Sequence, residues 1–253
     1  MSTPAPTRTW TKTAERPLRS AAKSLGVYLF AHFVGVPVPW RAVRQTDGKS
    51  LLAYEHERLL ALAAAGEHVP VVVAFDGDTM VTGDVGTTLE HLLHRIPEAD
   101  RLPLMCAASA DLAGFHARGH WHGGAQARNV TWDGHRFARI DFEERLYPGL
   151  PLETVQRYDA LQLVLSLARF LDPLGPAAVL QVLNAYREAW AIARPEASPA
   201  QSLQAFLQPL LPRLRRIARL AALSTRLDGS RELIRLRTVL DGMTQFVSAQ
   251  EST

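Results

Sequence analysis

The sequence predicts an α+β fold in which a strand-containing N-terminal part gives way to a mainly helical C-terminal part. Runs with strand-like alternation or β-branched residues occur only before residue 143, whereas nearly everything after Pro151 has apolar residues at helical spacing. The 253 residues are enough to bury a full core, and a hydrophobic fraction of 47% with 21% charged residues is typical of a globular protein.

The secondary-structure pattern is less clear in the first segments of the chain than in the later ones. Residues 1–8 have the composition of a disordered lead. The run "RTWTKTA" (8–14) alternates like a short strand and carries Lys12. Residues 19–33, "RSAAKSLGVYLFAHF", form a basic amphipathic segment, and a turn punctuated by prolines follows it.

The next segments are clearer. "SLLAYEHERLLALAAAG" (50–66) is the best helix of the first half, with a stripe of leucines and with Gly66 as its C-cap. Two strands are expected over 69–75 and 78–85, joined by the turn "DGD".

From Thr87 the pattern is helical, with one interruption. Two short strand-like runs, "NVTW" (129–132) and "RFARIDF" (136–142), are joined at "DGH" as a hairpin. The predicted helices cover residues 87–96, 101–119, 153–171, 175–193, 202–223 and 230–247.

The composition limits the classes of protein to consider. No apolar run reaches the roughly 18 residues that a membrane span requires, and residues 1–10 lack a signal-peptide hydrophobic region, so we expect a cytoplasmic protein. The single cysteine, Cys106, excludes an intramolecular disulfide and a cysteine-based zinc site. It lies in a stretch of small apolar residues, which favours a buried inert thiol over a nucleophile.

A basic stretch lies near the C-terminus. Residues 213–237 hold eight arginines against Asp228 and Glu232, a local excess of +6, whereas the whole chain carries +3. A solvated helix face is the default interpretation. The alternative is contact with an anionic membrane, which would place the protein peripherally at the inner membrane face, or with an acidic partner. The absence of aromatic residues from 213–237 argues against nucleic acid.

The candidate chemistry lies in "HWHGGAQARNVTWDGHRFARIDFEE" (120–144). Asp141 ends the second strand between Ile140 and Phe142, so its carboxylate emerges at the strand end. The hairpin would bring Asn129 beside it, and carboxylate and amide oxygens suit Mg²⁺. Taken singly, an Asn that caps a turn and an Asp that follows a strand are the more ordinary explanations.

Several motifs in order make the pattern specific. "LAGFHARGHWHGG" (112–124), followed by Asn129 and "IDFE", resembles the H-x-D-x-x-x-x-N and D-F-G-like segments of the protein-kinase-like superfamily. The small atypical branch is the nearest, with tRNA-modification-complex kinases, lipopolysaccharide-core sugar kinases and aminoglycoside phosphotransferases. "YEHERLLALAAAGEHVPVVV" (54–73) resembles their E-A-x-x-L-L helix. The matches run from Lys12 to Arg169, about 60% of the chain.

The resemblance implies a kinase-like two-lobe fold that binds ATP and Mg²⁺. Its N-terminal lobe would cover 9–86 and its helical C-terminal lobe 87–253. The implied site residues are the phosphate-binding Lys12 with its partner Glu55, the hinge Gly83, Asp84 and Val85 beside adenine, the loop residue His122, the metal ligands Asn129 and Asp141, and the supporting Asp159. Lys23 and Lys49 are alternatives to Lys12.

Two departures from the family pattern bear on activity. Only eleven residues precede Lys12, so the glycine-rich hairpin over the phosphates has no room. Gly124 occupies the position of the catalytic aspartate, which orients the acceptor hydroxyl and accepts its proton. Gln126 lacks a useful pKa, but it could orient a hydroxyl by hydrogen bonding.

These observations predict an atypical ATP-dependent phosphotransferase for a hydroxyl on a protein, sugar or lipid-linked acceptor. The alternatives are a pseudokinase that binds nucleotide without turnover and an enzyme for nucleotidyl transfer. A zinc site at His116, His120 and His122 is disfavoured, because Gly119 interrupts the helix and no cysteine completes the set.

Overall fold

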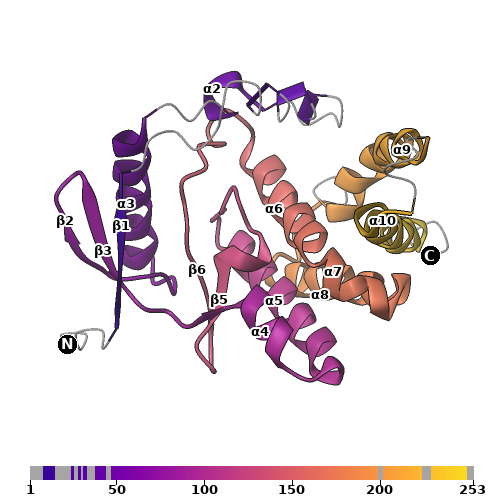
Figure 1. Cartoon of the computed structure of the whole chain (residues 1–253), viewed down its shortest axis with the longest axis horizontal. Helices are drawn as coiled ribbons and strands as arrows, with labels where there is room; N and C mark the ends of the chain where they lie inside the picture. The colour runs from indigo at the N-terminus through magenta and orange to yellow at the C-terminus, as the bar shows by residue number, and fades with distance from the viewer. Residues whose placement is uncertain are drawn as a thin grey trace.

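The computed structural model describes residues 8–14, 24–25, 28–29, 31–32, 38–43, 47–198, 202–223 and 229–249. Within them the fold is α+β, with two small antiparallel sheets and many helices (Figure 1). The lead at 1–7 and most of the amphipathic segment at 19–33 lie outside the described residues, as does Lys23.

The first sheet has the order β1-β3-β2. Strand β1 (Thr9–Thr13) pairs with β3 (Thr79–Gly83), which pairs with β2 (Val72–Phe75) on its other side. The predicted strand at 8–14 is confirmed, and the register places Lys12 opposite Met80. The order follows from two connections of different length. A short turn joins β2 to β3, whereas β1 comes from the far N-terminus.

Helix α3 (Gly48–Ala64) lies beside this sheet (Figure 1). Its N-cap is Asp47, whose side chain accepts a hydrogen bond from the Lys49 amide. Of the predicted leucine stripe, Leu52, Leu59 and Leu62 are buried, whereas Leu60 is 49% exposed. Gly66 follows the C-cap with φ of 83°, a left-handed conformation that favours glycine.

The second sheet has the order β4-β5-β6, from β4 (Thr87–Thr88), β5 (Val130–Trp132) and β6 (Phe137–Arg139). The predicted hairpin is confirmed, but the helix expected from Thr87 is wrong at its start. Thr87 and Thr88 pair with β5, and Thr88 then caps helix α4 (Leu89–Arg95). Threonine suits both roles, because it is β-branched and has a capping hydroxyl.

The remaining chain is helical, with α5 (Glu98–Ala117), α6 (Leu152–Ser166), α7 (Ala168–Leu171), α8 (Pro176–Ala193), α9 (Leu203–Ala222) and α10 (Arg231–Ser248). The single helix expected over 153–171 breaks at Leu167 into α6 and α7. Short 3₁₀ turns at Ala127–Asn129 and Asp172–Leu174, and the short helix α2 (Trp40–Val43), complete the described elements.

The core lies between the helices of the C-terminal part. Helix α5 packs along α8, and α10 packs on α8 and α9. At Gly242 a Cβ atom would stand 2.4 Å from the Cβ of Val179, so only glycine allows α10 to approach α8 this closely. No helix among the described residues is long and apolar enough to cross a membrane.

Candidate functional site

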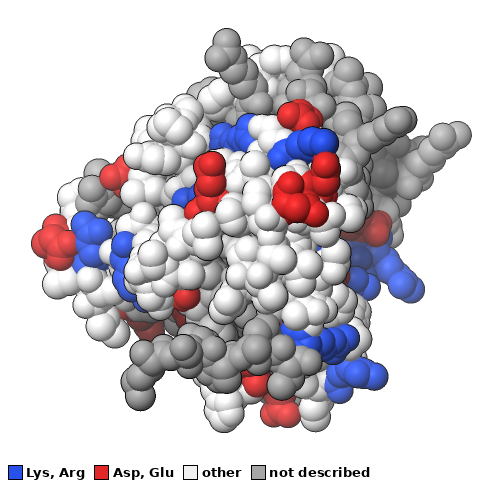
Figure 2. Space-filling view, turned by 90° about the vertical axis from the view of Figure 1, so that its left-hand side faces the viewer, with Lys and Arg blue, Asp and Glu red and all other residues white. Residues whose placement is uncertain are grey.

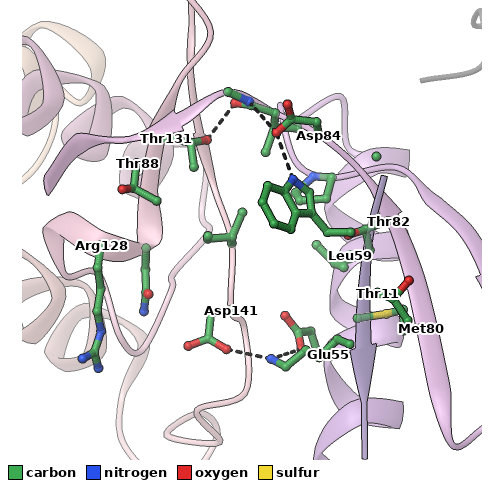
Figure 3. A pocket seen from close by; sticks show the side chains of 18 residues that line it. Thr11, Glu55, Leu59, Met80, Thr82, Asp84, Thr88, Arg128, Thr131 and Asp141 are labelled. Atoms are coloured by element: carbon green, nitrogen blue, oxygen red, sulfur yellow. Dashed lines mark hydrogen bonds and ion pairs between the residues drawn. The ribbon is translucent and has the colours of Figure 1, made fainter. Parts of the chain in front are cut away.

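A cleft of about 550 Å³ opens between the β1-β3-β2 sheet and the second sheet (Figure 3). Segments far apart in sequence line it: β1, α3, the connection 83–86, residues 128–129 and residues 140–141. The volume is in the range of small-molecule sites. Of the site residues predicted from sequence, those that line the cleft are Lys12, Glu55, Gly83, Asp84, Val85, Asn129 and Asp141. His122 and Gln126 are not among the lining residues.

Lys12 joins three acidic side chains at the bottom of the cleft. Its Nζ lies 2.7 Å from Glu55 Oε2 and 2.8 Å from Asp141 Oδ1 (Figure 3). Lys12 also pairs with Glu143. The implied ion pair between Lys12 and Glu55 is therefore present. Burial opposes the charged form of Lys12, but the carboxylates of Glu55 and Asp141 outweigh it and raise the pKa of Lys12 above its ordinary value.

Glu55 is the buried member of this group. It points from α3 toward the cleft, and its second oxygen, Oε1, accepts a hydrogen bond of 3.2 Å from the backbone amide of Phe142. Burial raises the pKa of Glu55, and the charge of Lys12 opposes that rise. Glu55 thereby connects α3 both to Lys12 and to the segment that carries Asp141.

Asp141 lies two residues beyond the end of β6. Its φ of 69° is left-handed, which Asp tolerates better than most residues, and such a conformation is common at functional sites. Asn129 is the last residue of the 3₁₀ turn directly before β5. Its Nδ2 donates to the carbonyl of Gly124 over 2.9 Å, which leaves its Oδ1 as an acceptor for a ligand.

Oxygen ligands for a metal ion gather at the same place. Among the described residues, one group brings three such side chains together: Glu55, Asp141 and Glu143, with ligand atoms within 4.8 Å of one another. Three carboxylates are an all-oxygen donor set of the kind that fits Mg²⁺, and Asn129 lines the same cleft. Sequence reasoning missed Glu143. The available signal was its spacing, since it follows Asp141 by two residues.

A buried network holds the loop of residues 120–129. Asp159 in α6 accepts hydrogen bonds from the backbone amides of His122 (2.7 Å) and Gly123 (2.8 Å). Asp159 therefore makes the hydrogen bonds to the loop that its implied supporting role requires. Arg58 in α3 donates to the carbonyl of Trp121 over 2.6 Å and lies 4.1 Å from the centre of that indole ring.

His122 hydrogen-bonds to the backbone through both of its ring nitrogens, and its ring lies 4.5 Å from that of Phe142. Its Nε2 lies 2.9 Å from the carbonyl of Ile140, and its Nδ1 accepts from the amide of Gly124 over 3.0 Å. Burial lowers the pKa of His122, so the neutral ring with its proton on Nε2 satisfies both bonds. The arrangement joins the loop to the strand before Asp141, and we therefore describe His122 as a positioning residue.

Gly124 is buried and has an ordinary backbone conformation, so a side chain at this position is not strained by φ. A Cβ there would stand 3.5 Å from Cγ of Glu144 and 3.7 Å from Nδ2 of Asn129, which is ordinary contact. Glu144 thus packs against the position where the family has its aspartate. Gln126 is half-buried, and its backbone amide donates to the Gly124 carbonyl over 2.7 Å.

The far end of the cleft is formed by the connection between β3 and β4. Asp84 accepts from the indole Nε1 of Trp10 over 3.1 Å, and Thr131 donates its hydroxyl to the carbonyl of Val85 (Figure 3). Trp10 lines the cleft although it is 54% exposed. Sequence reasoning missed it, although strand alternation places Trp10 on the same face of β1 as Lys12.

His116 and His120, two of the three histidines considered for a zinc site, have separate side-chain partners. His116 bonds through Nδ1 to Tyr186 over 2.7 Å and lies 3.4 Å from Asp159, whereas His120 lies 3.2 Å from Glu67. The carboxylates that sequence reasoning did not find are therefore present, but each serves a different histidine.

The structure also bears on Lys49, an alternative to Lys12, and on the reactivity of Cys106. Lys49 pairs with Asp78 over 2.6 Å on the surface and does not line the cleft, so it is not an alternative to Lys12. Cys106 is half-buried in α5, and burial raises the pKa of its thiol, which disfavours the reactive thiolate.

Comparison with known proteins assigns no family, because no protein-family model and no curated protein matches this chain significantly.

Proposed function

We propose that this protein is an ATP-dependent phosphotransferase with a kinase-like two-lobe fold, whose acceptor is a hydroxyl on a protein, sugar or lipid-linked molecule. One observation carries the proposal. Lys12 bonds to Glu55 and to Asp141, which are 43 and 129 residues away, at the bottom of a cleft of suitable size. Phosphoryl transfer depends chiefly on positioned charges of this kind.

In this proposal the end of the cleft that holds Lys12, Glu55 and Asp141 binds the phosphates. Lys12 provides the cation for the phosphate oxygens, and Glu55 fixes its position from α3. Asp141 and Asn129, with Glu143 beside them, would hold Mg²⁺, which neutralises phosphate charge when bound. In the structure as it stands the Lys12 ammonium lies among the three carboxylates, so nucleotide binding requires it to turn toward the phosphates.

The far end of the cleft, at the connection between β3 and β4, binds the purine base. Gly83, Asp84 and Val85 offer backbone groups at its edge, as the resemblance implies. The indole of Trp10 offers a stacking surface, and stacking of a base on an aromatic ring contributes about 1–3 kcal/mol. Trp10 comes from the strand that carries Lys12, so base and phosphates would be held by one element.

The acceptor end requires a carboxylate that Gly124 lacks. We assign this role to Glu144, because its side chain packs against the position of a Gly124 Cβ. The acceptor hydroxyl gives its proton to the Glu144 carboxylate while its oxygen attacks the γ-phosphorus. The bond from that phosphorus to the bridging oxygen breaks, and ADP leaves.

Thermal unfolding with and without nucleotide tests the binding step. ATP at one hundred times its Kd stabilises a protein by about 2.7 kcal/mol, which raises Tm by about 5–11 °C for a chain of this size. We expect this shift only with Mg²⁺ present, and we expect Asp141→Asn to abolish it. Asp78→Asn, on the surface, should retain it. No shift in the wild type at any Mg²⁺ concentration would contradict the proposal.

The fate of the phosphates separates the candidate reactions. Transfer of label from γ-labelled ATP to an acceptor identifies a phosphotransferase, and transfer of α-label identifies nucleotidyl transfer. The pseudokinase is favoured by one specific observation, the absence of an acidic side chain at Gly124 itself. Binding of Mg²⁺-ATP without transfer of either label would support it and would reject our assignment to Glu144.

A further inference from the structure

Helix α9 has an unusual charge composition. Its 20 residues, Leu203–Ala222, contain four arginines and no aspartate or glutamate. It lies with α10 at the end of the molecule away from the β1-β3-β2 sheet (Figure 1). The face at the sheet end is largely uncharged, and its basic and acidic side chains are intermixed (Figure 2). Helix α9 therefore differs from the face at the sheet end in carrying only basic charges, and of its four arginines Arg215 lies 3.8 Å from an acidic side chain, Asp241 of α10.

The exposed side of α9 combines this charge with apolar side chains. Arg213, Arg216 and Arg219 are exposed, and so are Leu220 and the C-cap Leu223, at 58% and 80%. At 100° per residue these five positions fall within one third of the helix circumference. The opposite side packs on the core through a run of leucines, so the helix is anchored and its basic, leucine-bearing side is presented outward.

Two hollows between α9 and α10 extend the basic side. One, of about 400 Å³, is lined by Arg215, Arg216 and Arg219 together with the hydroxyl residues Thr244 and Ser248. The other, of about 380 Å³, shares Arg215 and Arg219 with the first, but it is also lined by the acidic Asp241. Guanidinium groups around one hollow bind phosphate oxygens through several N–H donors, whereas the Thr244 hydroxyl accepts from Arg215 and donates to the Leu240 carbonyl.

We infer that the exposed side of α9 docks on a membrane surface rich in anionic phospholipid. The arginines match the charge of the headgroups, and the first hollow, which has no acidic side chain among its described lining residues, accepts their phosphates. Leu220 and Leu223 decide between partners, because they would enter the acyl boundary of a lipid layer, whereas an acidic protein would leave them in water. The inference does not depend on the nucleotide chemistry proposed above, and α9 lies at the opposite end of the molecule from the β1-β3-β2 sheet that lines the cleft (Figure 1).

Vesicle flotation of the full chain tests the inference. We expect binding to vesicles of phosphatidylcholine with 30% phosphatidylserine, no binding to phosphatidylcholine alone, and release by salt. Arg216→Gln with Arg219→Gln should weaken binding about 25-fold, since each surface arginine contributes about fivefold. A matched pair with the same loss of charge elsewhere, Arg95→Gln with Arg136→Gln, should change binding by less than about twofold.

A second double variant distinguishes lipid from other anions. Leu220→Ser with Leu223→Ser should weaken binding to the anionic vesicles and leave binding to polyglutamate unchanged, and millimolar inorganic phosphate should not release the vesicles. Equal binding to both vesicle types, equal losses in the two arginine pairs, or vesicle binding unaffected by the leucine changes would each overturn the inference. Circular dichroism melts of all variants identify any loss caused by unfolding.

Discussion

Replacing Lys12 by Met removes the cation from among three carboxylates while keeping the length and apolar stem of the side chain. Glu55, Asp141 and Glu143 would then face one another with ligand atoms within 4.8 Å. Like charges at this distance repel, and Glu55 is too buried for water to screen it fully. We therefore expect Lys12→Met to destabilise the folded state in the absence of metal.

The magnitude follows from the exposure of the partners. Breaking a fully buried ion pair costs about 3–5 kcal/mol. Here the side chains of Lys12 and Asp141 are 37% and 42% exposed, whereas those of Glu55 and Glu143 are only 5% and 16% exposed. Discounting for solvent screening gives about 2–3 kcal/mol, or a fall in Tm of about 4–12 °C.

The destabilisation caused by Lys12→Met should depend on pH. Burial already raises the pKa of Glu55, and removing Lys12 takes away the charge that opposes this rise. A carboxyl group whose pKa is raised by folding stabilises the folded state below its unfolded pKa, and this contribution is lost as pH rises through the folded pKa. The deficit of Lys12→Met should thus be smallest near pH 4.5, the ordinary pKa of glutamate, and should grow toward neutral pH.

Urea denaturation at several pH values measures this deficit, with Lys49→Met as the matched control. Lys49 also pairs with a carboxylate, but at an exposed position, so no resolvable change is expected. Millimolar Mg²⁺ should restore part of the stability of Lys12→Met, because a cation can again lie among the carboxylates. Equal effects of the two methionine substitutions, or a deficit that shrinks as pH rises, would refute the reasoning.

Three further substitutions test residues that shape the cleft, hold its loop or act as the proposed base. Gly86→Ala places a Cβ 2.3 Å from the Trp132 carbonyl at a φ of 101°, so we expect a loss of about 2–4 kcal/mol in urea denaturation; an unchanged midpoint would contradict this contact. Asp159→Asn leaves one loop amide without an acceptor, and we expect about 2–4 kcal/mol of destabilisation, with Mg²⁺-ATP binding weakened as well. Glu144→Gln should reduce γ-phosphate transfer by about 10²–10⁴-fold with little change in ATP Kd, and adding Gly124→Asp should recover part of the rate; full activity of Glu144→Gln would reject its role as the base.

The local sequence pattern was enough to predict most helices and strands and part of the candidate site. The leucine stripe and the Gly66 cap predict α3, and alternation predicts β1 with Lys12. These features depend on residues a few positions apart, where periodicity and capping act directly. The same reasoning failed at Thr87 and Thr88, whose strand pairing depends on β5 more than forty residues later.

Tertiary structure decided how the charges combine. The sequence by itself placed Lys12, Glu55, Asn129 and Asp141 on predictable elements, but not the addition of Glu143 to the partners of Lys12 or the packing of Glu144 on Gly124. Such contacts depend on how the loop of residues 140–146 packs against α3 and the 120–129 loop. No periodicity encodes that packing, because it results from the burial of Phe142 and Leu146 in the common core.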